Sequence, residues 1–329
     1  MTTMSPWTMS LGLSRLGLSR DDRPILIAAL FILVILVAGT TYTIAHFGTA
    51  PLLSPTYLLQ QLQIGSFLGI VAAGMMIVIL IAQIDLSVPW TLAAAAMMAT
   101  SIGGPLAIPV GLGVGLLVGL VNGIGVAYLR VPSMIFTLGV NAVMRGLMVA
   151  HTGGYAPQTT ATDLMRTLAS ERTFGIPNAL FVWAVVSVLV VVILQRTPLG
   201  RYIYAIGNKE AAAYLSGIDT RRVTVICFML CGLVAALAGV LLAGYSTKAY
   251  QAMGDAYLLP SIAAVVIGGT NILGGRGRYL GTLVGVVLIV LLNSVLSIME
   301  MPEAGRQVIY GLVIILMLLV YGRGERVTS

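Results

Sequence analysis

Charged residues are scarce in this chain. Asp, Glu, Lys and Arg make up 9% of its 329 residues, whereas a soluble protein carries about 25%. Hydrophobic residues make up 58%, and the mean hydropathy is +1.01. A charge at the centre of a bilayer costs about 2.5–3.5 kcal/mol, so long uncharged stretches between short charged clusters are typical of membrane-spanning helices. The composition excludes a soluble domain and predicts an all-α bundle that crosses a bilayer many times.

Residues that catalyse reactions or hold metals are also few. His46 and His151 lie at expected helix ends without metal-ligand spacing, which favours interfacial anchoring. Cys227 and Cys231 lie in one apolar segment and are interpreted as small buried hydrophobic residues. The sequence contains no HExxH, G-x-S-x-G or Walker A motif. It therefore predicts no metal site, no enzymatic activity and no ATP hydrolysis by this chain.

The positions of the basic residues indicate how the chain is oriented in the membrane. The formal net charge is +7, but these residues form no stripe interleaved with aromatics, which excludes a nucleic-acid partner. With the N-terminus in the cytoplasm, 13 of the 18 Lys and Arg residues lie in expected cytoplasmic segments and four in outer segments. The positive-inside rule requires such a bias. We therefore expect both termini in the cytoplasm.

Proline, glycine and charge divide the chain into ten expected spanning helices, each needing about 20 apolar residues. The uncharged run 86–129 is long enough for two helices, separated at Gly103-Gly104-Pro105. The others are expected at about 24–45, 57–81, 132–150, 178–195, 223–244, 257–273, 279–299 and 306–321. Eight helices, the alternative count, would require merging segments that Pro and Gly separate. The membrane domain thus covers 24–322, between a cytoplasmic extension (1–23) and a cytoplasmic tail (323–329).

Glycine is abundant, with 38 residues. Gly111, Gly113, Gly115, Gly119 and Gly123 lie on one expected helix and contain a small-xxx-small spacing, which lets helix backbones approach closely. The glycine-rich stretch 268–275 lacks the Lys-Ser/Thr that follows a phosphate-binding loop. We therefore interpret it as close helix packing and a turn.

The longest expected cytoplasmic loop, 196–222, contains a short predicted helix. Asn208 can cap its N-terminus, Glu210 favours its first turn, and Gly217 can end it after Ala211–Leu215. A helix this short does not persist alone in water. Either the bundle or a partner protein must hold it, so the loop is either a docking helix for a cytoplasmic motor or an ordinary structured loop.

Four stretches carry a resemblance to a known family. They are GMMIVI (74–79) leading to IDLSV (84–88), GLVNG (119–123) through VPSMIFTLG (131–139) to RG (145–146), the inner loop 197–218, and IGGT (267–270) through LGGRG (273–277) to GT (281–282). In order and spacing they are similar to the permease subunits of ATP-binding-cassette importers for ribose, xylose, arabinose and related monosaccharides. The resemblance covers most of the chain from about 57 to 322.

Two departures from the family pattern stand out. Pro89-Trp90 replaces the usual Gly-Ser after Asp85-Leu-Ser-Val, and Pro suits the first turn of a helix that Ser87 caps. Asn208-Lys209 replaces the usual Gly-Asn, so the N-cap of the short helix in the inner loop is expected at Asn208 or one residue away.

The resemblance implies a function and a set of partners. The chain would form the translocation path for a pentose or hexose in a bacterial cytoplasmic (inner) membrane. It would bind no cofactor; ATP and Mg²⁺ would sit on a cytoplasmic ATPase partner. A periplasmic sugar-binding protein would deliver cargo, and a second permease copy, identical or similar, would complete the path. A related importer for nucleosides or branched-chain amino acids, a stand-alone secondary transporter and a membrane enzyme are the alternatives.

The resemblance also assigns residues to roles. The ATPase-coupling residues are Asn208, Lys209, Glu210, Ala211, Ala212, Tyr214, Leu215 and Gly217. Residues expected to serve structure are Asp85, Ser87, Asn122, Gly268, Gly269, Gly274 and Gly275.

Polar side chains within apolar helices give a separate hypothesis for the path. Thr137, Asn141, Arg145 and Asn293 are costly in hydrocarbon unless they are paired or solvated. They either lie near the path or make hydrogen bonds between helices. Since Asp85 is the one carboxylate near the interior, the expected cargo is neutral, and Asp85 itself is interpreted as a cap for the following helix.

Overall fold

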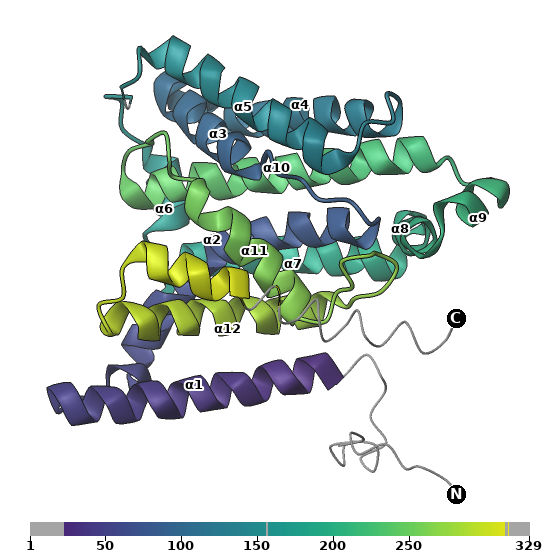
Figure 1. Cartoon of the computed structure of the whole chain (residues 1–329). Helices are drawn as coiled ribbons and strands as arrows, with labels where there is room; N and C mark the ends of the chain where they lie inside the picture. Colours follow the sequence, from purple (N-terminus) through teal and green to yellow (C-terminus); the bar gives the residue numbers. More distant parts are fainter. Residues whose placement is uncertain (1–22, 156, 313–314, 316–329) are drawn as a thin grey trace, which may run out of the picture.

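The computed structural model describes residues 23–155, 157–312 and 315, which form a bundle of helices (Figure 1). The expected extension, except for Arg23, and the expected tail lie outside these residues. The helices are α1 (Arg23–Phe47), α2 (Pro55–Leu80), α3 (Val88–Ile102), α4 (Ala107–Ala127), α5 (Ser133–Thr152), α6 (Asp163–Ala169), α7 (Asn178–Arg196), α8 (Pro198–Asn208), α9 (Glu210–Leu215), α10 (Thr220–Ser246), α11 (Asp255–Ile267) and α12 (Tyr279–Ile298). A further helical segment covers 303–312. Two single-turn 3₁₀ helices (Pro51–Leu53 and Gly104–Leu106) and a two-stranded hairpin, β1 (Arg172–Thr173) and β2 (Ile176–Pro177), complete the described elements.

Seven helices of the described part are long and apolar enough to cross a bilayer: α1, α2, α4 with its preceding 3₁₀ turn, α5, α7, α10 and α12. Their bounds match the expected ones to within a few residues, and the chain breaks at Gly103 and Gly104 as expected. Two more expected spans, α3 and α11, are too short to cross alone. The expected span 306–321 is helical from 303 to 312 and at 315, and its other residues from 313 on lie outside the described part.

The expected helix 257–273 is wrong at its C-terminal end, because α11 stops at Ile267. The next residues form the glycine-rich loop, in which Gly269, Gly274 and Gly275 have φ of +90°, +86° and +73°. Only glycine adopts this left-handed region at no steric cost. The interpretation of this stretch as a turn is confirmed.

Two helices lie outside the expected set. Thr162 caps α6 by accepting a hydrogen bond from the Met165 N–H, and Thr197 caps α8 by accepting one from the Gly200 N–H. In both cases a Thr followed by Asp or Pro gives the start signal in the sequence. Both helices are too short or too polar to register as apolar spans.

Helix α2 forms the centre of the bundle, with its residues from Gly65 to Leu80 buried. It contacts α7, α10, α11 and α12. Helix α10 packs most extensively against α4 along the glycine stripe: a Cβ on Gly115 would lie 2.2 Å from the Gly232 carbonyl oxygen, and one on Gly119 would lie 2.4 Å from that of Phe228. The close approach that the glycine spacing predicts is confirmed.

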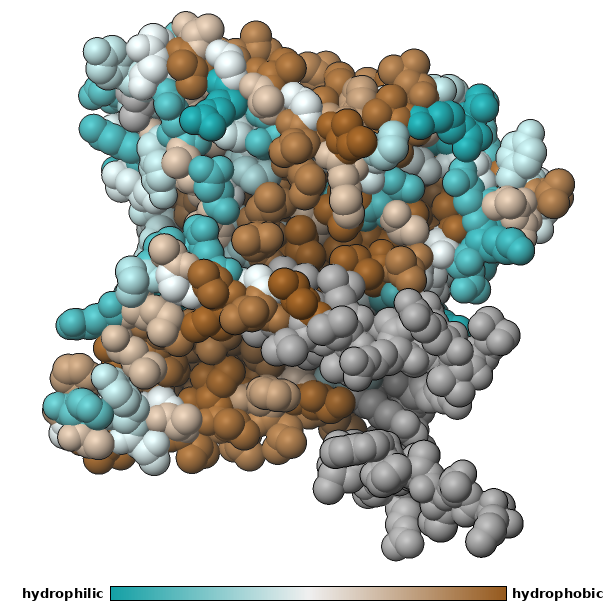
Figure 2. All heavy atoms as spheres, in the orientation of Figure 1, coloured by the Kyte–Doolittle hydropathy of each residue, from teal (hydrophilic) through white to brown (hydrophobic). Residues whose placement is uncertain are grey.

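The bundle has two distinct ends. The start of α1 lies at the same end as α8 and α9, and α6 lies at the opposite end (Figure 1). Side chains along α1 are largely exposed and apolar, including Leu30, Phe31 and Leu33. Figure 2 shows brown hydrophobic surface over α1 and α12, with hydrophilic surface concentrated at the two ends. Such a band is typical of helices that face lipid.

Candidate functional site

The linker between α2 and α3, residues 81–87, is not helical, and Ile81, Ile84, Asp85 and Ser87 in it are buried. Its Asp85 side chain is buried and accepts hydrogen bonds from the Ser87 N–H (2.9 Å) and the Ser87 hydroxyl (2.6 Å). Asn122 of α4 donates to both Asp85 oxygens (3.3 and 3.4 Å) and to Ser87 Oγ (2.7 Å). Three residues with expected structural roles therefore meet in one cluster, where hydrogen bonds offset the cost of burying a carboxylate.

The expected cap of α3 differs in detail from the observed one. Ser87 occupies the N-cap position, but its side chain bonds Asp85 rather than a free N–H of the helix. The Ser87 carbonyl accepts the first helical hydrogen bond, from Thr91. The Ser87 hydroxyl instead donates to the buried Asp85 side chain, which satisfies a polar group that has no access to water.

Removing the Asn122 amide is expected to destabilise the bundle. In Asn122→Ala the buried Asp85 carboxyl group loses its donors from α4, and leaving a buried polar group without a partner costs about 1–3 kcal/mol. Thermal unfolding in detergent should show a lower melting temperature. The matched change Asn178→Ala, which removes one hydrogen bond to the Thr167 carbonyl from a half-buried side chain, should have a smaller effect. Equal shifts for the two variants would contradict the role of Asn122.

A polar stripe on α5 holds the same linker and the first turn of α3. Ser133, Thr137 and Asn141 recur at every fourth residue, so they lie on one face of the helix. Their side-chain oxygens accept hydrogen bonds from the backbone N–H groups of Ile84 (3.3 Å), Leu86 (2.9 Å) and Trp90 (3.3 Å), respectively. A non-helical backbone inside a membrane protein needs such partners. Thr137 and Asn141, two residues of the path hypothesis, thus make hydrogen bonds between elements.

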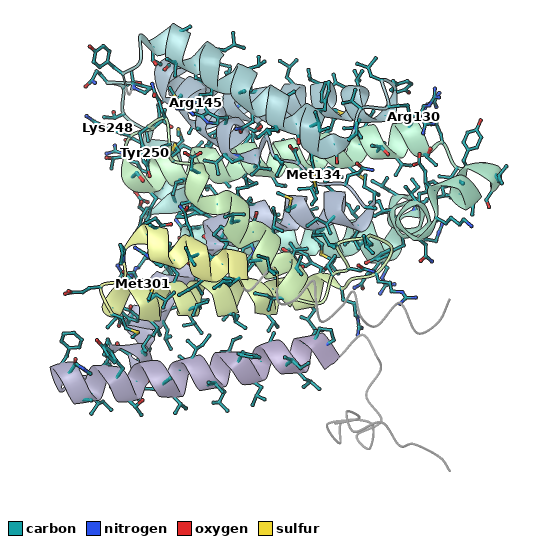
Figure 3. All side chains as sticks on the ribbon, viewed as in Figure 1. Arg130, Met134, Arg145, Lys248, Tyr250 and Met301 are labelled. Atoms are coloured by element: carbon teal, nitrogen blue, oxygen red, sulfur yellow. The ribbon has the colours of Figure 1, made fainter. Side chains whose placement is uncertain are left out.

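The other two residues of that hypothesis lie apart. Arg145, one turn beyond Asn141, has its guanidinium carbon 6.0 Å from the centre of the Trp90 ring. Asn293 of α12 accepts a hydrogen bond from Arg306 Nη1 (2.8 Å) in the next helical segment. In Figure 3 Arg145 and Met301, which precedes that segment, both lie toward the α6 end of the bundle, Arg145 near the top of the view and Met301 lower, beside α12. The four residues therefore do not form one group.

A cleft of about 380 Å³ opens between α3, α5, α11 and the segment 303–312. Its hydrogen-bonding side chains are Asn141, Asp255, Glu303, Gln307 and Tyr310. Arg145 lies close enough to Asp255, a lining residue, for their opposite charges to interact. Of these residues, sequence reasoning identified Asn141 and Arg145. Asp255 was missed, although a carboxylate at the edge of an apolar run is a signal that could have identified it.

At the other end of the bundle, α8 and α9 form the expected inner loop. The N-cap of α9 is Lys209, so the expected cap Asn208 is wrong by one residue. Asn208 is the last residue of α8 and packs against Gly275, and the backbone becomes extended only at Lys209 (φ −163°, ψ 101°). Gly217, with φ +84°, follows the end of α9 as expected.

Helix α9 presents apolar side chains to the outside. Tyr214 is 69% exposed and Leu215 is 85% exposed, whereas Ala213 is buried against the bundle. Ala211 and Ala212 are also exposed. Glu210 holds the start of the helix by accepting a hydrogen bond from the Thr220 hydroxyl (3.2 Å), and its Oε1 lies 3.8 Å from Arg130 Nη1. Figure 3 shows Arg130 near this end of the bundle. The bundle holds α9, and its outer face is free to contact a partner.

Glycines anchor α8 to the end of α2. A Cβ on Gly207 would lie 1.8 Å from the Leu80 carbonyl oxygen, and the same oxygen accepts a hydrogen bond from the Gly275 N–H (2.9 Å). Gly274 lies against Ala82, Gly268 against the backbone of Gly281, and Gly269 against Pro24. The four loop glycines of the expected structural set therefore serve close packing.

Within the described residues, no group of three or more His, Cys, Asp or Glu side chains could hold a metal ion. Cys227 and Cys231 are buried free thiols on α10.

The comparisons with known proteins agree on one class. Residues 57–318 match the family described as "Branched-chain amino acid transport system / permease component". The ribose import permease protein RbsC of Bacillus subtilis is 38% identical over 297 residues, which cover 88% of this chain and 90% of that protein. RbsC of Haemophilus influenzae is 37% identical over 260 residues, 76% and 80% of the two chains. The fructose import permease protein FrcC of Rhizobium meliloti is 33% identical over 283 residues, 79% and 75% of the two chains. No solved structure matches the chain.

Proposed function

This chain belongs to the family described as "Branched-chain amino acid transport system / permease component", and from this membership we propose that it is the membrane-spanning subunit of an ATP-driven sugar importer. It is a transport subunit and not an enzyme. The observation that carries the proposal is the similarity to sugar import permeases over most of the chain. The cargo is a monosaccharide, a pentose or hexose, that crosses beside the cleft between α3, α5 and α11.

The exposed face of α9 is the proposed docking site for a cytoplasmic ATPase, which binds ATP and Mg²⁺. Two observations support this assignment. The side chains of Tyr214 and Leu215 are apolar and exposed at the end of the bundle, beyond the lipid-facing band. Exposed apolar side chains beside charged ones are typical of protein interfaces. At the opposite end, α6 and the hairpin face the proposed periplasmic sugar-binding protein.

The proposed topology places the α8–α9 end in the cytoplasm of a bacterial inner membrane, together with the start of α1. Ten crossings follow if the linker 81–87 and α3 make one crossing together, and the loop before α11 with α11 makes another. The hydrogen bonds from α5 to the linker support this count, because they satisfy non-helical backbone at membrane depth.

Among the residues of the path hypothesis, Asn141 and Arg145 lie beside the proposed path, and Thr137 and Asn293 serve helix packing. A second copy of the chain faces the cleft and closes the path. Several charged or amide side chains are exposed on this face, including Arg145, Asp255 and Gln307. Lipid would not tolerate them at this depth, whereas a water-filled path between two permeases would.

Affinity purification from native membranes tests the proposal. A stoichiometric ATPase should co-purify with the chain, and the complex, reconstituted in liposomes with a sugar-binding protein, should import a monosaccharide only when ATP is hydrolysed. Two outcomes would contradict the proposal. Sugar uptake by the chain without an ATPase would establish a stand-alone transporter, and ATP-driven uptake of an amino acid or nucleoside would establish a different cargo.

A further inference from the structure

The two short helices α3 and α11 begin next to each other. A Cβ on Gly254, the residue before α11, would lie 2.0 Å from the carbonyl oxygen of Pro89 in the first turn of α3. Glycine is therefore required where the two helix starts touch. The cleft of about 380 Å³ lies at this contact, with Pro89 on one side and Asp255 on the other. Its volume is within the range of about 300–1,000 Å³ that small-molecule sites occupy.

The cleft lies well within the bundle along the proposed transport direction. Asn141 is eleven residues from the end of α5 at Thr152. With a rise of about 1.5 Å per residue, its Cα lies about 16 Å from that end of the helix. This depth is about half of a hydrocarbon core that is about 30 Å thick. Charged and amide side chains in a cleft at this depth have a functional reason more often than a structural one.

The side chains of the cleft match the hydroxyl groups of a neutral sugar. Asp255 and Glu303 accept hydrogen bonds, and Asn141 and Gln307 can both donate and accept. Tyr310 is buried and contributes an aromatic ring to the wall. Sugar hydroxyls donate and accept in the same way, and the ring face of a sugar is apolar.

The charges of the cleft argue against an anionic ligand. The two carboxylates in the lining repel anions. The neighbouring cations already have partners: Arg145 interacts with Asp255 and with the Trp90 ring, and Arg306 interacts with Glu303 and Asn293. A phosphorylated sugar or a free carboxylate would find no unpaired cation among these groups.

We propose that this cleft is a sugar-binding subsite on the translocation path, in which Asp255 and Gln307 bind hydroxyl groups of the passing sugar. The proposal rests on the proposed function and names the residues that contact the cargo. The two groups come from α11 and from the segment 303–312, so the bound sugar bridges elements that are distant in sequence. Movement of either element changes the distance between the two groups and so changes the affinity of the subsite.

The test compares a sugar with its monodeoxy analogues in the reconstituted importer. The variants are Asp255→Asn and Gln307→Ala. Glu300→Gln, at an exposed carboxylate in the turn after α12, is the matched control. Initial uptake is measured at limiting sugar concentration with the same ATPase and binding protein throughout. We expect Asp255→Asn and Gln307→Ala to lower uptake of the sugar about 10-fold or more, as the loss of a hydrogen bond to a charged or buried group would.

The analogues distinguish a residue that contacts the sugar from one that only stabilises the fold. One analogue lacks the hydroxyl that the replaced residue binds, and the variant and the wild type should import this analogue at the same rate. The effects of removing the side chain and removing the hydroxyl are then not additive, as expected for two groups in contact. A structural role would lower uptake of the sugar and of all analogues by one factor, and that result would overturn the subsite, as would unchanged uptake. A wild-type importer that carries no sugar at all would overturn the proposed function itself.

Discussion

Replacing Leu215 with Asp is expected to abolish ATP-driven uptake while the chain still folds and inserts. Leu215 is 85% exposed on α9, so its replacement removes no contact within the bundle. In the proposed complex it enters an apolar pocket of the ATPase, where a carboxylate would be buried without a partner. Loss of one such central anchor costs about 2 kcal/mol or more, which corresponds to about a 30-fold weaker docking affinity.

The measurements are co-purification of the ATPase, ATP hydrolysis stimulated by the sugar-loaded binding protein, and sugar uptake. All three should fall in Leu215→Asp. Leu53→Asp in the 3₁₀ turn after α1 is the matched control, because it places the same charge at an exposed Leu of the opposite end. Glu210→Ala should have a smaller effect on uptake, since its ion pair with Arg130 is exposed and such pairs contribute less than about 1 kcal/mol. Undiminished uptake in Leu215→Asp would refute the docking role of α9.

The helices and their breaks could be predicted from the sequence because the physical cause of each is local. Apolar runs of spanning length predict the long helices, and Gly103-Gly104-Pro105 predicts the break between α3 and α4. The small-xxx-small spacing predicts close packing along α4. It does not identify α10 as the partner, because nothing local connects residues 115 and 232.

The bounds of two elements were misplaced because a tertiary contact or a neighbouring element sets them. Helix α11 is shorter than its apolar run because the chain uses Gly268–Gly275 for a loop that packs against α2. Such a tertiary contact overrides the apolar pattern. The cap of α9 moved from Asn208 to Lys209 because α8, which precedes it, was not recognised and includes Asn208.

The candidate site was predicted least completely. Polar residues at every fourth position of α5 indicate one polar face, but the sequence does not show that this face binds the α2–α3 linker about 50 residues away. The cleft combines Asn141, Asp255 and Gln307, which are more than 100 residues apart from first to last. Side chains brought together over such separations are visible only in the folded chain.

Adding one methyl group to Gly115 is expected to separate α4 from α10. The Cβ of Gly115→Ala would lie 2.2 Å from the Gly232 carbonyl oxygen and 2.4 Å from the Ala236 Cβ, so two helix backbones must move apart. Overpacking a tight core costs about 1–3 kcal/mol and more where backbone is displaced. This interface is central, since α10 also packs against α2 and α3. The melting temperature in detergent and the yield of folded protein should both fall.

The same helix offers a control variant whose melting temperature should not fall. Gly113 is exposed, two residues from Gly115, and a Cβ placed on it meets nothing within 4 Å in the described structure. Gly113→Ala therefore adds the same atoms to the same helix without a clash. It should leave the melting temperature unchanged or raise it, because Ala favours a helix over Gly by about 1 kcal/mol. If both variants melted alike, the glycine stripe would reflect composition and not contact, and the α4–α10 interface would have to be placed elsewhere.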